Sequence, residues 1–474
     1  MRHTKLALAA MTLAVLAGCG GTDPAPGDQT IKNKFSAEVS FGDSLSDIGS
    51  YNVGTVAALK GGKFTINGDN TSINEALTGR NWTELLAAQL GVAAPCPAVT
   101  GLDGDASKGF SVPQVAHANC YSYAQGGARI TNPVGAGHKL TGSALGALTI
   151  PVATQVANHL KAAGGKFKGD EMVLVMAGGG DVLAQLGALS AAATAEGQKV
   201  GAAAGAAAGA QAYVKSLVGL LAASATNPAT AAQAIGLAAQ TEAARAGSSQ
   251  TTITQAAIGA AAVQPGNSAV AAPAVYGPLV AKATADATAA GNAAGAAAGA
   301  KAGADYAAAH GPELVVAMAT AGTELANLVK TQIIANGANY VVVNNLPDVA
   351  TTPSGRSQPA STQALINAMV SAFNGALATG VGSESKALLV DVFAVSHDQA
   401  TNPGPYGLTN VTDTACDLST AKNPLGSALV CNGSNLKSGD VSHWSFADDV
   451  NPTPFNNLLL ARYVSKALVM KGWL

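Results

Sequence analysis

The feature that most constrains the fold is a long central stretch of small residues. From about residue 191 to 309 the chain is almost entirely Ala, Gly, Thr, Ser and Gln. It contains two similar runs, residues 201–209 and 291–299, in which glycines lie four residues apart. Glycines at this spacing line one face of a helix and let a second backbone approach closely. We therefore expect two helices that pack as an antiparallel pair and form an insertion.

Two other interpretations of this stretch stay open. A membrane hairpin is disfavoured by the polar and charged residues Gln211, Lys215 and Lys301. A disordered, low-complexity linker would also have such a composition. The helical insertion is favoured over both because Ala is the best helix former, although Gly weakens helices.

On either side of this stretch, short apolar runs alternate with helical patterns. The runs rich in β-forming residues are 37–41, 121–124, 171–177, 339–345 and 387–393. Residues 171–177 and 340–344 are almost continuously apolar, which is typical of strands covered on both faces. The alternation with helical patterns at 82–90 and 361–377 predicts an α/β fold with a parallel sheet between helices.

The first residues have the pattern of an export signal. Arg2 and Lys5 precede an apolar run, and small residues lead to Cys19, so residues 1–18 are predicted to be a signal peptide. The cysteine resembles the lipidation site of bacterial lipoproteins, which implies a membrane anchor at Cys19 in the cell envelope. Gly20 after it would favour the outer membrane. A plain secreted protein is the alternative, and residues 19–34 are expected to be a flexible tether.

The remaining cysteines predict disulfides, and the low charge excludes one class of partner. Four cysteines remain, and an even number in an exported chain predicts disulfides. Sequence proximity favours Cys96–Cys120 and Cys416–Cys431, although three pairings are open. The spacing is not that of a zinc site, so no metal or cofactor is expected. The formal charge is −2 and only 11% of residues are charged, which argues against nucleic acid as a partner.

A candidate nucleophile follows the first predicted strand. Residues 41–47 read Phe-Gly-Asp-Ser-Leu-Ser-Asp, with Ser44 at a strand-to-helix turn. At the carboxyl edge of a parallel sheet, a serine hydroxyl and nearby backbone N–H groups can face a substrate carbonyl. Gly42 allows the tight turn that this placement requires.

These residues resemble the nucleophile block of the GDSL, or SGNH, hydrolase family. Further segments resemble other blocks of this family, in family order: 81–86, 123–129, 173–181, 345–349, 405–411 and 446–453. The resemblance implies a three-layer αβα, flavodoxin-like sheet of about five parallel strands. It places the hydrolase domain at residues 35–190 and 311–474, interrupted by the Ala/Gly-rich helical insertion at 191–310. It implies an exported serine esterase or lipase that acts on a small-molecule or lipid ester through an acyl-serine intermediate.

The resemblance also implies roles for individual residues, with two departures. Ser44 is the nucleophile, Asp448 the acid of the triad, and the backbone N–H groups of Ser44 and Gly127 bind the oxyanion. Gly180 stands where the family has an asparagine that donates to the oxyanion, and Asn451 stands where it has the histidine base. An amide cannot accept the serine proton. Loss of the base costs on the order of 10⁶ in kcat in a serine triad, and loss of one oxyanion donor about 10²–10³.

Other residues are therefore candidates for the missing base. His443 is the histidine nearest the lost position, and His397 is a weaker candidate. Asp448 or Asp449 would be a poor base. We expect an ester hydrolase with impaired turnover. The alternative is a surface protein that kept the fold, lost the chemistry and binds a ligand or partner. Substitutions introduced by engineering or sequence error are a third explanation. If the family residues fit, Asn451→His with Gly180→Asn should raise turnover by orders of magnitude.

Overall fold

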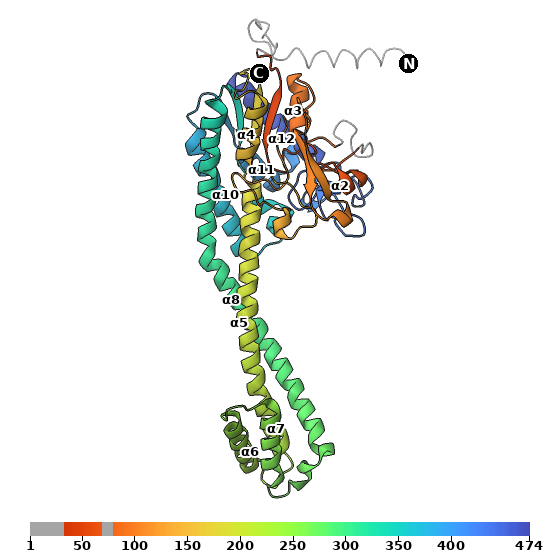
Figure 1. Ribbon diagram of the computed structural model, residues 1–474, viewed down its shortest axis with the longest axis vertical. Coiled ribbons are helices and arrows are strands. Elements are labelled where there is room, and N and C mark those ends of the chain that lie inside the picture. The colour runs from red at the N-terminus through yellow and green to blue at the C-terminus, as the bar shows by residue number, and fades with distance from the viewer. Residues whose placement is uncertain (1–32, 69–78) are drawn as a thin grey trace, which may run out of the picture.

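The computed structural model describes residues 33–68 and 79–474. These residues form an α/β domain and a long helical hairpin that projects from it (Figure 1). The predicted signal peptide, Cys19 and most of the predicted tether lie outside the described residues.

The α/β domain is organised around a parallel sheet, as the sequence predicts. Four strands pair in the order β1-β4-β5-β6, with β1 at Glu38–Gly42, β4 at Met172–Met176, β5 at Tyr340–Asn344 and β6 at Ala387–Val390. Every residue of β1 and β4 is buried, because helices cover both faces of the sheet. The α/β class with a parallel sheet is confirmed.

Two of the predicted strands differ in extent. The segment expected at 121–124 is joined to β1 by an isolated bridge between Ser40 and Ser122, with two backbone hydrogen bonds and one between the two serine hydroxyls, so the regular sheet has four strands and not about five. Its pairing ends where the chain turns at residues 125–128. The run expected at 387–393 ends as a strand at Val390, because the Asp391 side chain accepts the N–H of Ala394 and starts helix α11, Val392–Thr401.

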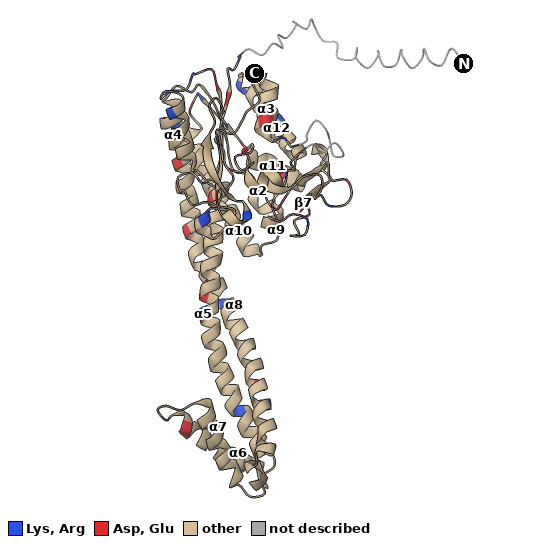
Figure 2. Ribbon diagram, turned by 45° about the vertical axis from the view of Figure 1, so that its right-hand side comes forward, with Lys and Arg blue, Asp and Glu red and all other residues tan. Residues whose placement is uncertain are grey.

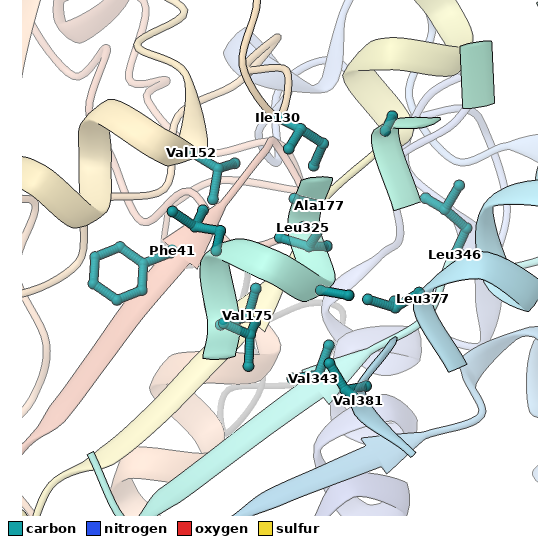
Figure 3. Packing of buried hydrophobic residues seen from close by; sticks show 14 of the residues in the cluster. Phe41, Ile130, Val152, Val175, Ala177, Leu325, Val343, Leu346, Leu377 and Val381 are labelled. Atoms are coloured by element: carbon teal, nitrogen blue, oxygen red, sulfur yellow. The ribbon is translucent and has the colours of Figure 1, made fainter. Parts of the chain in front are cut away.

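The helices on the two faces bury different sets of side chains. On one face, Val39, Phe41, Val175 and Val343 pack against α4 (Val152–Ala162), α8 (Pro273–Leu328) and α10 (Ala360–Val381). Figure 3 shows Phe41, Val175 and Val343 in this cluster. On the other face, Met172, Leu174 and Val342 pack against α3 (Trp82–Leu90) and α12 (Pro454–Lys471). This alternation along each strand fixes which helices cover which face.

Smaller elements surround the sheet. They are α2 (Gly54–Ala58), α9 (Pro353–Arg356), the antiparallel pair β2 (Val99–Asp103) and β3 (Ser111–Ala116), and the parallel pair β7 (Asn410–Thr414) and β8 (Trp444–Phe446). Both disulfides lie in this domain, and their pairing, Cys96–Cys120 and Cys416–Cys431, confirms the predicted one.

The hairpin consists of two long helices that continue out of the domain. Helix α5 begins at Gly179, directly after β4, and runs without interruption to Ala222, while α8 returns over Pro273–Leu328. Short helices α6 (Pro228–Ala243) and α7 (Gln250–Ala262) form the far tip, as Figure 1 shows. Figure 2 shows that charged residues are sparse along α5 and α8.

Backbone contact between glycines holds the two long helices together. Gly197 lies against Gly299, Gly201 against Gly295, and Gly205 against Gly291, so the helices are antiparallel. A methyl group added to Gly201 would lie 2.7 Å from the carbonyl oxygen of Gly295. Beyond these glycines, larger apolar side chains gather at the tip, where Leu217, Leu221 and Ile235 are fully buried.

One helix among the described residues, Ala360–Val381, is long and apolar enough to cross a membrane by length and composition. This helix is α10, and its residues Phe373, Leu377 and Val381 belong to the buried cluster against the sheet.

Candidate active site

Ser44 lies at the carboxyl edge of the sheet because β1 ends in glycine. Gly42 has a φ of 155°, and a Cβ there would lie 2.0 Å from the Met176 carbonyl oxygen, so a side chain at this position would push β1 away from β4. Gln155 of α4 fixes the turn, since its side chain both accepts the Gly42 N–H (2.9 Å) and donates to the Gly42 carbonyl (2.9 Å). Ser44 follows two residues later and is half-buried.

Five of the predicted site residues line one cavity. This cavity, of about 550 Å³, is bordered by Ser44, Gly127, Gly180, Asp448 and Asn451. Most of its other lining residues are apolar, and they include Phe64, Leu145, Leu183, Leu346 and Leu429. Segments far apart in the sequence therefore meet at one cavity beside the carboxyl edge of the sheet.

The backbone around Ser44 offers two N–H groups to a ligand. The N–H of Gly126 donates to Asp47 (2.9 Å) and is not available. The N–H groups of Ser44 and Gly127 have no hydrogen-bond partner within residues 33–68 and 79–474. Gly127 has a φ of 78°, and a Cβ there would lie 2.1 Å from the Ala136 carbonyl oxygen. Gly127 can therefore present its N–H to the cavity only as glycine.

Asp43 joins the serine turn to helix α5. Its carboxylate accepts the N–H of Leu45 (3.2 Å) and the N–H of Gly179 (3.1 Å), the first residue of α5. Burial raises the pKa of Asp43 to about 6, against the opposing effect of these hydrogen bonds. The carboxyl group is thus mainly ionised at neutral pH, where the positive end of the helix dipole stabilises it.

Asp448 and Asn451 form a closed pair. The side-chain amide of Asn451 donates to both carboxylate oxygens of Asp448, at 2.9 and 3.0 Å. The backbone N–H groups of Ala428 (2.7 Å) and Asn451 (2.7 Å) donate to the same carboxylate. The Asn451 Oδ1 atom is buried and has no partner among the described residues. This amide oxygen can accept a hydrogen bond but carries no proton that it could donate.

Gly180 lies too close to a neighbouring backbone to carry a side chain. A Cβ at this position would lie 2.1 Å from the carbonyl oxygen of Ala128. That carbonyl is held in place because Asp181 binds the Arg129 side chain (2.8 Å) and accepts the Ile130 N–H (2.9 Å). Contrary to the expectation from the sequence, Gly180→Asn would have to displace this backbone and would not simply restore a donor.

The candidate substitute bases lie in different places. His443 is exposed, its Nδ1 is 2.9 Å from the Ser442 hydroxyl, and its ring packs on Phe455 at 4.4 Å between centroids. His397 pairs with Asp348, 2.7 Å apart. Of the histidines in the described part of the chain, none lines the cavity, whereas Asp449 does. The structure therefore does not bring His443 or His397 to Ser44.

Several residues that line the cavity were not indicated by any sequence motif. Residues 143–147 and 424–429 contribute to its wall from loops, and the second loop lies between Cys416 and Cys431. Leu183 contributes from the first turns of α5. The Asp43–Gly179 hydrogen bond was detectable only as an acidic residue beside Ser44 and a glycine-rich helix start.

Comparison with known proteins adds no relative. No protein-family model matches the sequence, and no curated protein matches it significantly. The assignment of function therefore depends on the residues of this chain.

Proposed function

We propose that the protein is an exported serine ester hydrolase of the GDSL/SGNH type with slow turnover, on a flavodoxin-like three-layer fold. One observation carries this proposal: Ser44, Gly127, Asp448 and Asn451 line a single, mostly apolar cavity at the carboxyl edge of the sheet. Cavities of this size and character are typical binding sites for small molecules.

In this proposal the ester carbonyl lies between Ser44 and Gly127. The Ser44 oxygen attacks the carbonyl carbon, and the developing oxyanion receives hydrogen bonds from the two backbone N–H groups without partners. The alcohol leaves with a proton, and water then cleaves the acyl-serine bond to release the acid and restore the serine hydroxyl. The N-terminus of α5 at the cavity adds a favourable dipole for the oxyanion.

Proton transfer is the slow part of this scheme. Asn451 Oδ1 is buried without a partner among the described residues, and an amide oxygen cannot take the proton of the Ser44 hydroxyl. The serine proton must pass to solvent, so the attack lacks general-base assistance.

A second candidate function is ligand binding without turnover. The Asp448–Asn451 pair favours it, because the carboxylate already receives amide and backbone donors and needs no imidazolium beside it. The same cavity would then hold an ester or an acyl group at the cell surface.

Labelling and turnover separate the two candidates. We expect a fluorophosphonate probe to modify Ser44, detected by intact mass, and p-nitrophenyl butyrate to be hydrolysed slowly. Asn451→His should raise kcat by 10² or more, because it supplies a base next to Asp448. Ser44→Ala should abolish both signals, and Ser107→Ala, at an exposed serine that does not line the cavity, should leave them unchanged.

If neither the wild-type protein nor folded Asn451→His is labelled or shows turnover above Ser44→Ala, the hydrolase proposal is wrong. Binding of the ester by equilibrium dialysis under the same conditions would then favour the second candidate.

We also propose that the protein is exported and anchored to the cell envelope through Cys19. The two disulfides support an oxidising compartment. Cys19→Ser should move the protein from the membrane fraction to the soluble fraction, and an unchanged distribution would contradict the anchor.

A further inference from the structure

A second, larger cavity lies along the base of the hairpin. We call it the hairpin groove, with a volume of about 1390 Å³. Its walls come from α5 (residues 183–202), from α8 (residues 295–315) and from residues 349–368 around α9 and the start of α10, together with Val450.

The hairpin groove adjoins the Ser44 cavity. Four residues line both of them: Leu183, Val349, Thr352 and Val450. Leu183 is 37% exposed although it is a large apolar side chain. A ligand whose reactive group lies at Ser44 can therefore extend past Leu183 into the groove without leaving the protein surface.

The lining of the groove has no charge. Among the described residues that border it, the polar ones are only Ser, Thr and Gln, and the rest are apolar or glycine. Two charged pairs lie on the same helices, Glu196 with Lys199 and Lys301 with Asp305, and none of these four residues lines the groove. Glycine and alanine leave its walls smooth, so it suits a flexible unbranched chain better than a bulky ring system.

The size of the groove also points to a long ligand. The Ser44 cavity alone is large enough for a short ester, and the groove adds more volume than the whole of a typical small-molecule site. We propose that the hairpin groove binds the long acyl chain of an ester whose carbonyl lies at Ser44. This proposal rests on the proposed function for the position of the carbonyl, and it assigns a binding role to the base of the insertion.

Two glycines on α5 provide a matched test. Gly187 lines the groove and Gly219 does not, and an added Cβ at either position meets no atom within 4 Å. Gly187→Trp should therefore fill the groove and Gly219→Trp should only add an exposed side chain. Both variants should fold, because replacing glycine in a helix is favourable by up to about 1 kcal/mol. Ala304→Trp on α8, which also lines the groove, repeats the test from the opposite wall.

Reaction with Ser44 gives the first measurement. Rates of labelling are compared for a butyl and a hexadecyl fluorophosphonate. We expect Gly187→Trp and Ala304→Trp to slow the hexadecyl probe at least tenfold and the butyl probe less than twofold, and Gly219→Trp to affect neither. Equal slowing of both probes, or none, in the groove variants would overturn the proposal.

A binding measurement does not depend on the chemistry at Ser44. The fluorescence of cis-parinaric acid, a free long-chain acid, is titrated with Ser44→Ala alone and combined with each tryptophan variant. We expect Kd to rise at least tenfold with Gly187→Trp and to stay within twofold with Gly219→Trp. Absence of binding to Ser44→Ala, or equal binding to both combined variants, would show that no acyl-chain site exists there.

The two measurements separate the two proposals. If neither fluorophosphonate reacts while parinaric acid binds with the expected pattern, the hydrolase proposal fails and the groove stands as a site for the free acid. If both probes react equally well in every variant, the hydrolase stands and the groove is not its acyl-chain site.

Discussion

The α/β domain and the hairpin are held together in different ways. The domain buries large side chains, with Trp82, Phe41 and Phe373 fully enclosed, and carries both disulfides. Along the hairpin the contact is backbone on backbone through glycines, and large apolar side chains return only at the tip. Glycine therefore has two roles in one chain: it fixes single turns and close contacts around Ser44, and it forms a continuous interface between α5 and α8.

The difference predicts two separate unfolding events. Small side chains bury little apolar area per residue, so the hairpin gains less from the hydrophobic effect than the domain does. All three tryptophans, Trp82, Trp444 and Trp473, lie in the domain. Tryptophan fluorescence therefore follows the domain alone, whereas far-UV circular dichroism is dominated by the long helices.

Reduction of the disulfides should have the largest effect and should act on the domain only. A cross-link that closes a loop of about 15 residues contributes about 3 kcal/mol, and the longer Cys96–Cys120 loop somewhat more. With both bonds reduced, we expect the fluorescence midpoint in urea to fall sharply while hairpin helicity persists. If fluorescence and circular dichroism were lost together, the hairpin would not be stable without the folded domain.

The buried histidine of the domain, His159, is expected to make the stability of the domain depend on pH, with a smaller effect than the disulfides have. His159 is enclosed by Phe41, Tyr123 and Phe167, and both ring nitrogens lack a partner among the residues described. Burial, followed by the charge of Lys168, lowers its pKa to about 4. In the unfolded chain this histidine binds a proton below about pH 6.5, and in the folded chain only near pH 4. As pH falls from 6.5 to 4, His159 therefore lowers the free energy of unfolding by up to about 3 kcal/mol.

His159→Phe should therefore gain stability relative to the wild-type protein between pH 6.5 and pH 4. Urea titrations followed by fluorescence at both pH values measure the difference. A constant difference between the two proteins across this window would contradict the assignment to His159.

The glycine interface can be tested with a matched pair of hairpin variants. In Gly201→Leu the new side chain meets the Gly295 backbone, and we expect a loss of about 1–3 kcal/mol in the dichroism transition with unchanged fluorescence. Gly219→Leu lies on the same helix in open space and should leave hairpin stability the same or slightly raise it. Equal effects of the two substitutions would mean that close approach does not hold the hairpin together.

The smallest effect is expected at the tip. Asn227 caps α6, since its side chain accepts the N–H of Thr230 (3.3 Å). Asn227→Ala should lower the stability of helix α6 by about 1 kcal/mol and leave the rest of the molecule unchanged. Hydrogen exchange should speed up in the first turn of α6 and stay unchanged in β4. Faster exchange throughout the molecule would show that tip and domain unfold as one unit.

The sequence predicted the features that depend on local pattern. The parallel strands, the helices in the Ala/Gly stretch and the disulfide pairs follow from apolar runs, spacing and proximity. The start of α5 at Gly179 could not be predicted in this way. Its first turns line the cavity and its later turns form the hairpin, so one helix belongs to both parts. The close contact of Gly180 with the Ala128 carbonyl and the exposure of His443 depend on tertiary packing, which no local pattern encodes.

Helix α5 has its first residues beside Ser44 and its last ones in the tip. Its 44 residues span about 66 Å without interruption. One continuous helix therefore carries both the Gly179 N–H that binds Asp43 and the apolar residues Leu217 and Leu221 of the tip.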